Sequence, residues 1–280
     1  MAKIIVLKFV IFFGVIYGLL FLFWRQIETY LSFPALWMDI STTELEDLTS
    51  NHEAEKITLT WYNNKELTGI FIDNNEEKTL FFFLPNGGSI STFFNHILEV
   101  QELWVNLAVM DYPGYGQSEG FPYEKDVYKS SEIFFDHIKE EKNLSNENII
   151  LLWFSIWTAP ASYLAKDKDH KLLILFSPFT SRYDIASSLY WFPLQKFLLM
   201  ENSFNIEKNI QEVETPTMIV YWEKDTLVPP EMSQKVYNKS SANQKESIKV
   251  EGAGHNDLFR YLVQNFGNDF DNFLQKLNRN

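Results

Sequence analysis

Three residues of types used in nucleophilic catalysis follow one another along the chain. Ser155 lies in "LLWFSIWTAPASYLA", Asp225 in "YWEKDTLVPPE" and His255 in "VEGAGHND". A serine hydroxyl is a weak nucleophile until an imidazole accepts its proton, and a carboxylate can hold that imidazole in the required tautomer. The sequence therefore predicts Ser155 as nucleophile, His255 as its base and Asp225 as the residue that orients His255.

The segments around these residues predict how they are brought together. Ser155 follows an aliphatic strand segment and precedes a small-residue helix start, which is typical of a nucleophile elbow. Asp225 and His255 also follow strand segments. Because ligands bind outside the carboxyl ends of the strands in open α/β sheets, we expect all three side chains at one edge of a sheet.

Acyl transfer through a serine also needs amide donors for the oxygen that becomes negative. One donor is expected from Ile156, directly after the nucleophile, and a second from the loop "FFFLPNGGSIS" after the third strand segment. Pro85 has no N–H group, so we predict that the second donor is Asn86 or Gly87.

Strand and helix patterns alternate through most of the chain. This alternation predicts an α/β fold with a mostly parallel, eight-stranded sheet flanked by helices, within one domain over residues 55–280. The long apolar connection around residues 179–205 is expected to form a short cap-like insertion. The strand segments are "KITLT", "ELTGIFI", "KTLFFFLP", "LAVMDY", "NIILLWFS", "KLLILFSP", "TPTMIVYW" and "ESIKVEG".

The amino terminus is apolar over residues 4–24, a length that covers a hydrocarbon core of about 30 Å as a helix. A cleavable signal peptide is the alternative, but its apolar run is shorter, about 7–15 residues, and ends in small residues. We therefore predict a membrane anchor over 1–26 and a linker over 27–54. Lys3 and Lys8 favour a cytoplasmic amino terminus, with the domain on the non-cytoplasmic side.

Composition excludes several classes of function. The formal net charge of −13 argues against nucleic acid as a partner, since phosphate binding needs clustered Lys and Arg. The chain has no cysteine, and its 5 histidines include no His-x-x-x-His pair. We therefore expect no metal site. Nothing in the sequence bears on the oligomeric state.

Together these motifs resemble the α/β-hydrolase superfamily, and more closely its membrane-anchored serine hydrolases related to depalmitoylating thioesterases. The similarity covers about residues 55–275. It implies an α/β-hydrolase fold and a cofactor-free Ser–His–Asp esterase or thioesterase. An amino-terminal membrane segment is common in that group. The predicted anchor, which would contact the lipid bilayer, and the apolar stretch "LYWFPLQKFLLM" favour a small or lipid-like ester substrate. The matching motifs are "NGGSIS", "VMDYPGYGQSEG", "FSIWTAPASYLA", "LFSPFTS", "EKDTLVPPEMS" and "GAGHND".

Tryptophan stands at several positions where this family has glycine. Trp153 and Trp157 flank the nucleophile in place of the family's Gly-x-Ser-x-Gly, and Trp222 and Trp104 lie at two further such positions. Glycine is also scarce, at 11 of 280 residues, where average usage predicts roughly 20. The usual His-Gly before the oxyanion loop is Leu84-Pro85 here.

Three interpretations of these tryptophans stay open. They are core aromatics, or they mark an inactive α/β-hydrolase-like binding protein, or they are glycines encoded by UGA and translated with the wrong codon table. In the tryptophan form, we expect the indoles of Trp153 and Trp157 to push the helix off the strand and move Ser155. The expected result is weak or absent esterase activity. The enzyme prediction is therefore conditional on glycine at both positions.

Overall fold

One eight-stranded sheet forms the centre of the domain in the computed structural model. The model describes residues 8–9, 11–19, 23, 29–30, 32–37, 45–46, 49–50, 54–100, 104–189 and 203–277. The strands are β1 (Ala54–Thr60), β2 (Glu66–Ile72), β3 (Thr79–Phe83), β4 (Asn106–Met110), β5 (Ile149–Phe154), β6 (Leu172–Phe176), β7 (Thr217–Trp222) and β8 (Lys245–Val250). Each of the predicted strand segments forms one of these strands.

The strand order is β1-β2-β4-β3-β5-β6-β7-β8. Strand β2 is antiparallel to both of its neighbours, and all the other pairs are parallel. The predicted mostly parallel, eight-stranded sheet is therefore confirmed. The β1–β2 connection turns through Asn63 and Asn64, both with positive φ, a conformation that asparagine tolerates better than most residues.

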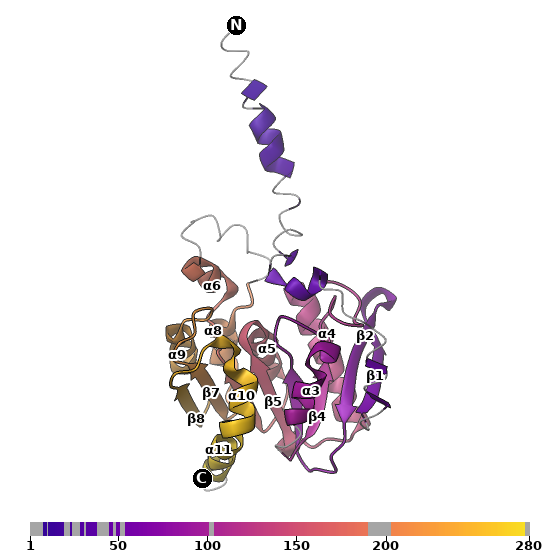
Figure 1. Ribbon diagram of the computed structural model, residues 1–280, viewed down its shortest axis with the longest axis vertical. Helices are drawn as coiled ribbons and strands as arrows, with labels where there is room; N and C mark the ends of the chain where they lie inside the picture. The colour runs from indigo at the N-terminus through magenta and orange to yellow at the C-terminus, as the bar shows by residue number, and fades with distance from the viewer. Residues whose placement is uncertain are drawn as a thin grey trace.

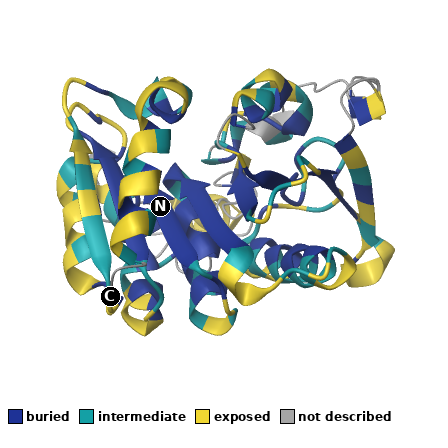
Figure 2. Ribbon diagram, turned by 90° about the horizontal axis from the view of Figure 1, so that it is seen from below, coloured by how far each residue is buried: buried dark blue, intermediate teal, exposed yellow. Residues whose placement is uncertain are grey.

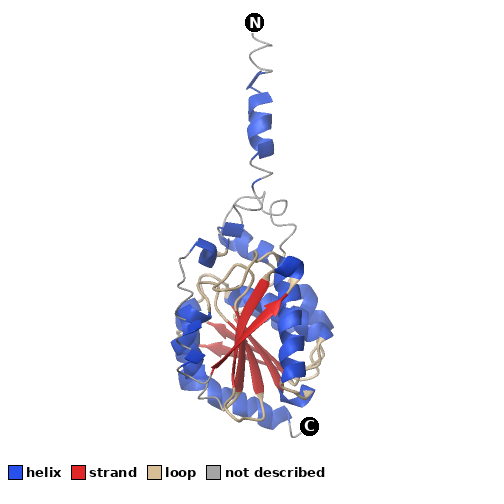
Figure 3. Ribbon diagram, turned by 90° about the vertical axis from the view of Figure 1, so that its right-hand side faces the viewer, coloured by secondary structure: helices blue, strands red, loops and turns tan. Residues whose placement is uncertain are grey.

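Helices cover both faces of the twisted sheet (Figure 3). One face carries α3 (Ile90–Val100), α10 (Leu258–Tyr261) and α11 (Gly267–Leu277), with a π-helical segment, Leu262–Phe266, between the last two. The other face carries α4 (Glu124–Glu141), α5 (Thr158–Asp167), α8 (Ile206–Asn209) and α9 (Pro230–Lys239). A further helix, α6 (Arg182–Leu189), lies at the edge of the domain near the amino-terminal residues (Figure 1).

Alternation along each strand divides the core into two layers, and the central strands are buried throughout (Figure 2). In β5, Trp153 points into the layer under α4 and α5, whereas Phe154 points into the layer under α3 and α10. Continuous apolar strands are the expected result when both faces of a sheet are covered.

The predicted anchor over 1–26 and linker over 27–54 lie only partly within the described residues. No helix in those parts of the chain that the structure describes is both long and apolar enough to cross a bilayer. The cap-like insertion around 179–205 is described as far as Leu189 and again from Ser203; its middle lies outside the described residues.

Gly69 marks the tightest packing between β2 and the helix layer. A β-carbon there would lie 2.4 Å from Cε2 of Phe134 and 2.8 Å from the carbonyl oxygen of Val109. We predict that Gly69→Ala lowers the free energy of unfolding by about 2 kcal/mol, because overpacking a filled core costs about 1–3 kcal/mol. Urea denaturation measures the change. Gly87→Ala is the control, since nothing lies within 4 Å of its added β-carbon; equal losses in both variants would contradict the prediction.

Candidate active site

Ser155 occupies the bend between β5 and the helix that follows it. Strand β5 ends at Phe154, a 3-10 turn covers Ser155–Trp157, and α5 begins at Thr158. Ser155 has φ +56°, in the left-handed region that non-glycine residues seldom adopt. The Thr158 hydroxyl donates a hydrogen bond to the Ser155 carbonyl at 2.6 Å, which closes the bend.

His255 joins the serine to the carboxylate. Its Nε2 atom lies 3.0 Å from Oγ of Ser155, and its Nδ1 atom lies 2.7 Å from Oδ2 of Asp225. Nδ1–H must donate to the carboxylate, which leaves Nε2 with the lone pair that accepts the serine proton. The structure therefore brings the three residues together in the order that proton transfer requires.

Backbone amides hold the Asp225 carboxylate in place. Its Oδ1 atom accepts hydrogen bonds from the N–H groups of Leu227 at 2.9 Å and Val228 at 2.8 Å, so Oδ2 is left to face the imidazole. The loops after β7 and β8 are also tied together, because the N–H of Lys224 donates to the carbonyl of Ala253 at 2.8 Å. The separation of Asp225 and His255 is thus set by the backbone of two neighbouring strands.

One residue that positions the imidazole escaped the sequence analysis. The ring of Phe154 lies 4.8 Å from the ring of His255, centroid to centroid, at an interplanar angle of 37°. Phe154 is the last residue of β5, and strand alternation turns it to the α10 side. Its place directly before Ser155 was the available signal, because a strand residue next to the nucleophile must point to one face of the sheet.

The predicted oxyanion donors lie on two segments that flank the serine. Asn86 and Gly87 form the turn between β3 and α3, and Ile156 follows Ser155 in the 3-10 turn. Asn86 is half-buried and Gly87 is exposed. The hydroxyl of Tyr115 lies 2.7 Å from Oδ1 of Asn86 and 3.1 Å from its carbonyl oxygen. The roles of Asn86, Gly87 and Ile156 as donors stay predictions.

Both elbow tryptophans are fully buried, yet the bend keeps its form. Trp153 stacks on Phe83 at 3.9 Å between ring centroids, and Trp157 stacks on Tyr112 at 3.7 Å. The expectation that these indoles displace Ser155 is wrong in this structure. Both side chains enter the aromatic layer under α4 and α5, so they do not separate the strand from the helix.

Two other observations do bear on the tryptophans. The buried indole N–H groups of Trp157 and Trp222 have no hydrogen-bond partner among the described residues, and an unsatisfied buried donor costs roughly 1–3 kcal/mol. Trp104 is 78 % exposed and has φ +57°. That backbone conformation strains an indole-bearing residue and suits glycine.

Asp111 is a buried carboxyl group beside the site. Its Oδ1 atom accepts the N–H of Ile90 at 2.8 Å, at the start of α3, and its Oδ2 atom accepts the N–H of Gln117 at 3.4 Å. A β-carbon on Gly116 would lie 2.0 Å from Oδ2, so only glycine fits there. Burial raises the pKa of Asp111 to about 7 from an ordinary value of 3.8. These contacts tie the end of β4 to the start of α3 and to the loop after β4.

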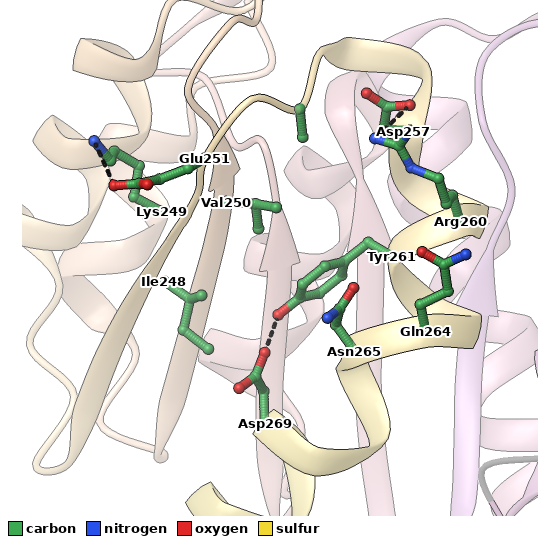
Figure 4. A pocket seen from close by; sticks show the side chains of 11 residues that line it. Ile248, Lys249, Val250, Glu251, Asp257, Arg260, Tyr261, Gln264, Asn265 and Asp269 are labelled. Atoms are coloured by element: carbon green, nitrogen blue, oxygen red, sulfur yellow. Dashed lines mark hydrogen bonds and ion pairs between the residues drawn. The ribbon is translucent and has the colours of Figure 1, made fainter.

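The described residues contain no cluster of His, Cys, Asp or Glu able to hold a metal ion. Figure 4 shows a pocket of about 420 Å³ between β8 and the helices after His255. Its wall includes Asp257 and Arg260, which form an ion pair at 3.1 Å. The lining includes none of Ser155, Asp225 and His255.

The strand order of the sheet and the helices on both of its faces define an α/β-hydrolase fold. Solved structures share this fold. An α/β-hydrolase from Vibrio vulnificus superposes with a TM-score of 0.71 at 21% identity, over 88% of this chain and 91% of that one. An esterase from Pyrococcus furiosus superposes with a TM-score of 0.67 at 17% identity, over 85% of this chain and 94% of that one.

Sequence relatives agree with the fold, although no family model matches the chain. Human alpha/beta hydrolase domain-containing protein 17B is 30% identical over 191 residues, covering 67% of this chain and 63% of that protein. Arabidopsis thaliana protein WAV2, also an alpha/beta hydrolase domain-containing protein, is 28% identical over 189 residues, covering 62% and 61%. The chain spans less than two thirds of the length of either relative. These findings support assignment to the α/β-hydrolase superfamily.

Asp111 gives the stability a defined pH dependence. Because the folded state binds the Asp111 proton more tightly than the unfolded state, the contribution of Asp111 to the free energy of unfolding should fall as pH rises from about 4 to about 7 and then level off. We predict that the free energy of unfolding of the unaltered chain, minus that of Asp111→Asn, falls over that pH range. The slope reaches at most about 1.4 kcal/mol per pH unit. Urea titrations of both proteins at pH 5 to 8 measure it, and a constant difference would contradict the prediction.

Proposed function

We propose that the protein is a serine hydrolase that cleaves an ester or thioester through an acyl-enzyme formed on Ser155. The observation that carries the proposal is the pair of contacts made by His255, 3.0 Å to Ser155 and 2.7 Å to Asp225. A histidine that bridges a serine and a buried carboxylate is the arrangement that converts a hydroxyl into a nucleophile.

The proposed reaction uses these three side chains and main-chain amides close to Ser155. Nε2 of His255 accepts the proton as Oγ of Ser155 forms a bond to the substrate carbonyl carbon, and the imidazolium then protonates the leaving alkoxide or thiolate. The N–H of Ile156, with that of Asn86 or Gly87, stabilises the tetrahedral oxyanion. Water, deprotonated by His255, then attacks the acyl carbon; the bond from that carbon to Oγ of Ser155 breaks, the imidazolium returns the proton to Oγ, and the acid is released. Asp225 stays ionised throughout and stabilises the imidazolium.

The proposed substrate is a lipid or an acylated protein, and three observations support this choice. The apolar residues 4–24 have the composition of a membrane anchor, which would hold the domain at a bilayer on its non-cytoplasmic side. One structural neighbour is named as an esterase. The rings packed against Trp157, two residues after Ser155, are aromatic and include Tyr112 and Phe204.

A non-catalytic binding protein is the second candidate. It is favoured by Trp157, whose buried indole fills the space beside the start of α5 two residues after the nucleophile. The Leu84-Pro85 pair, in place of His-Gly before the oxyanion turn, points the same way. In this case the contacts among Ser155, His255 and Asp225 would serve only to stabilise the fold.

Labelling with a fluorophosphonate probe separates the two candidates. We predict covalent labelling of the full chain that is abolished in Ser155→Ala, because the probe reacts only with an activated serine. Asp225→Asn should slow labelling by a factor on the order of 10⁴, since it favours the wrong tautomer of His255. Ser130→Ala is the matched control, because that buried hydroxyl donates to the Val127 carbonyl of its own helix. If neither the folded unaltered chain nor the folded double variant Trp153→Gly/Trp157→Gly were labelled, the result would support the binding protein.

We also propose that some of the tryptophans are glycine in the native protein. The fold does not require this, because the triad assembles with Trp153 and Trp157 present. Support comes from the left-handed conformation of Trp104; the buried indoles without a partner among the described residues include that of Trp61, which is not one of these positions. UGA codons in the coding DNA at these positions, and a native mass lower by the corresponding exchanges, would establish the proposal; UGG codons would end it.

Trp104 offers a direct physical test of this idea. We predict that Trp104→Gly has a free energy of unfolding about 1 kcal/mol higher than Trp104→Ala. Both changes remove the exposed indole, but only glycine relieves the left-handed strain of roughly 1–2 kcal/mol. Urea denaturation of the two variants decides the matter. Equal stabilities would show that the backbone at residue 104 does not favour glycine.

A further inference from the structure

A few described residues between the apolar amino-terminal stretch and the sheet lie against the candidate active site. We refer to residues 29–30 and 32–37 as the link segment. It includes a 3-10 helix, Pro34–Trp37, and lies beside α4 at the same end of the domain as α6 (Figure 1). Three separate contacts join the link segment to elements that flank Ser155.

The first contact is with the oxyanion turn. Nδ2 of Asn86 donates a hydrogen bond to the carbonyl of Ser32 at 2.8 Å, while Tyr115 contacts Oδ1 and the main-chain carbonyl of Asn86 from the other side. The side chain and the carbonyl of Asn86 are therefore held between the link segment and the loop after β4. Because a peptide plane is rigid, fixing these groups also fixes the direction of the neighbouring amides.

The second contact is with the nucleophile turn. The buried ring of Phe33 stacks on Trp157 at 5.4 Å between centroids and meets the ring of Phe204 edge-on at 6.3 Å. The guanidinium of Arg182, at the start of α6, lies 5.1 Å from the centroid of Phe33. Phe33 thus joins the turn after Ser155 to both described ends of the 179–205 insertion.

The third contact is with the loop after β4. The side chain of Leu36 lies so close to Gly114 that a β-carbon there would be 2.6 Å from Cδ2 of Leu36. Gly114 has φ +85°, so both its space and its conformation require glycine. This loop also carries Tyr115, the residue that holds Asn86 from the second side.

We propose that the link segment is a positioning element of the active site: Ser32 and Phe33 hold the oxyanion turn in register with the nucleophile turn. The inference rests on the proposed function. It follows that activity depends on residues that directly continue the amino-terminal apolar stretch, although they lie far from Asn86 and Ser155 in sequence. Oxyanion donors act only within a narrow range of distance, and a misplacement of about 1 Å can cost about 10²-fold in rate.

The test uses the full chain and p-nitrophenyl butyrate, with active sites counted by fluorophosphonate labelling. Asn86→Asp keeps the main-chain N–H but places an oxygen opposite the Ser32 carbonyl. Phe33→Ala removes the aromatic contact, and Phe33→Leu is the conservative variant. Tyr30→Ala is the matched control, because Tyr30 is in the same segment but its ring contacts Phe121, outside the site.

We expect kcat per labelled site to fall about tenfold or more in Asn86→Asp and Phe33→Ala, with KM within about twofold, because the donors act on the transition state rather than on substrate binding. Phe33→Leu should recover most of the rate, and Tyr30→Ala should keep it. Unchanged kcat per labelled site in both test variants would overturn the proposal, as would a loss explained entirely by a smaller folded fraction.

Hydrogen exchange distinguishes this proposal from the proposed function. Amides of residues 84–94 should exchange faster in Phe33→Ala than in the unaltered chain, whether or not the protein turns over substrate. If the unaltered chain shows no turnover and no labelling, the hydrolase proposal fails, while faster exchange still supports the positioning contact. Unchanged exchange in that peptide would overturn it.

Discussion

The site depends on one strained bend. Ser155 is held with φ +56° at the point where β5 turns into the 3-10 turn before α5, a conformation that persists only where the surrounding structure enforces it. Here the enforcement comes from a central strand bonded on both sides, to β3 and to β6. The hydroxyl that results stands at the edge of the sheet where the loops after β7 and β8 deliver Asp225 and His255.

The sequence predicted the sheet and the meeting of the three side chains because those features follow from strong local patterns. Continuous apolar strands alternate with helices, and parallel strands carry whatever follows them to one edge. The positions of Asp225 and His255 needed no information beyond the ends of β7 and β8. The bend itself was predictable from a lone serine between a strand and a helix start.

The sequence predicted the tryptophans poorly because side-chain direction at a bend is a tertiary property. Volume alone suggested that Trp153 and Trp157 would separate strand from helix. The structure instead turns both indoles into the aromatic layer that contains Phe83 and Tyr112. The contact between Ser32 and Asn86 could not be predicted from the sequence either. The two residues are 54 positions apart, and neither lies in a periodic pattern that predicts the other.

Among the described strands, β8 is the last in the sheet order and pairs with β7 alone, yet the imidazole of His255 is carried on the loop that follows it. The nucleophile, in contrast, stands on an interior strand. Local opening of β8 would therefore displace His255, the proposed proton acceptor, while the bend at Ser155 stayed intact. For the proposed hydrolase, heating should therefore cause a reversible loss of activity below the unfolding temperature of the domain, and cooling should restore the activity.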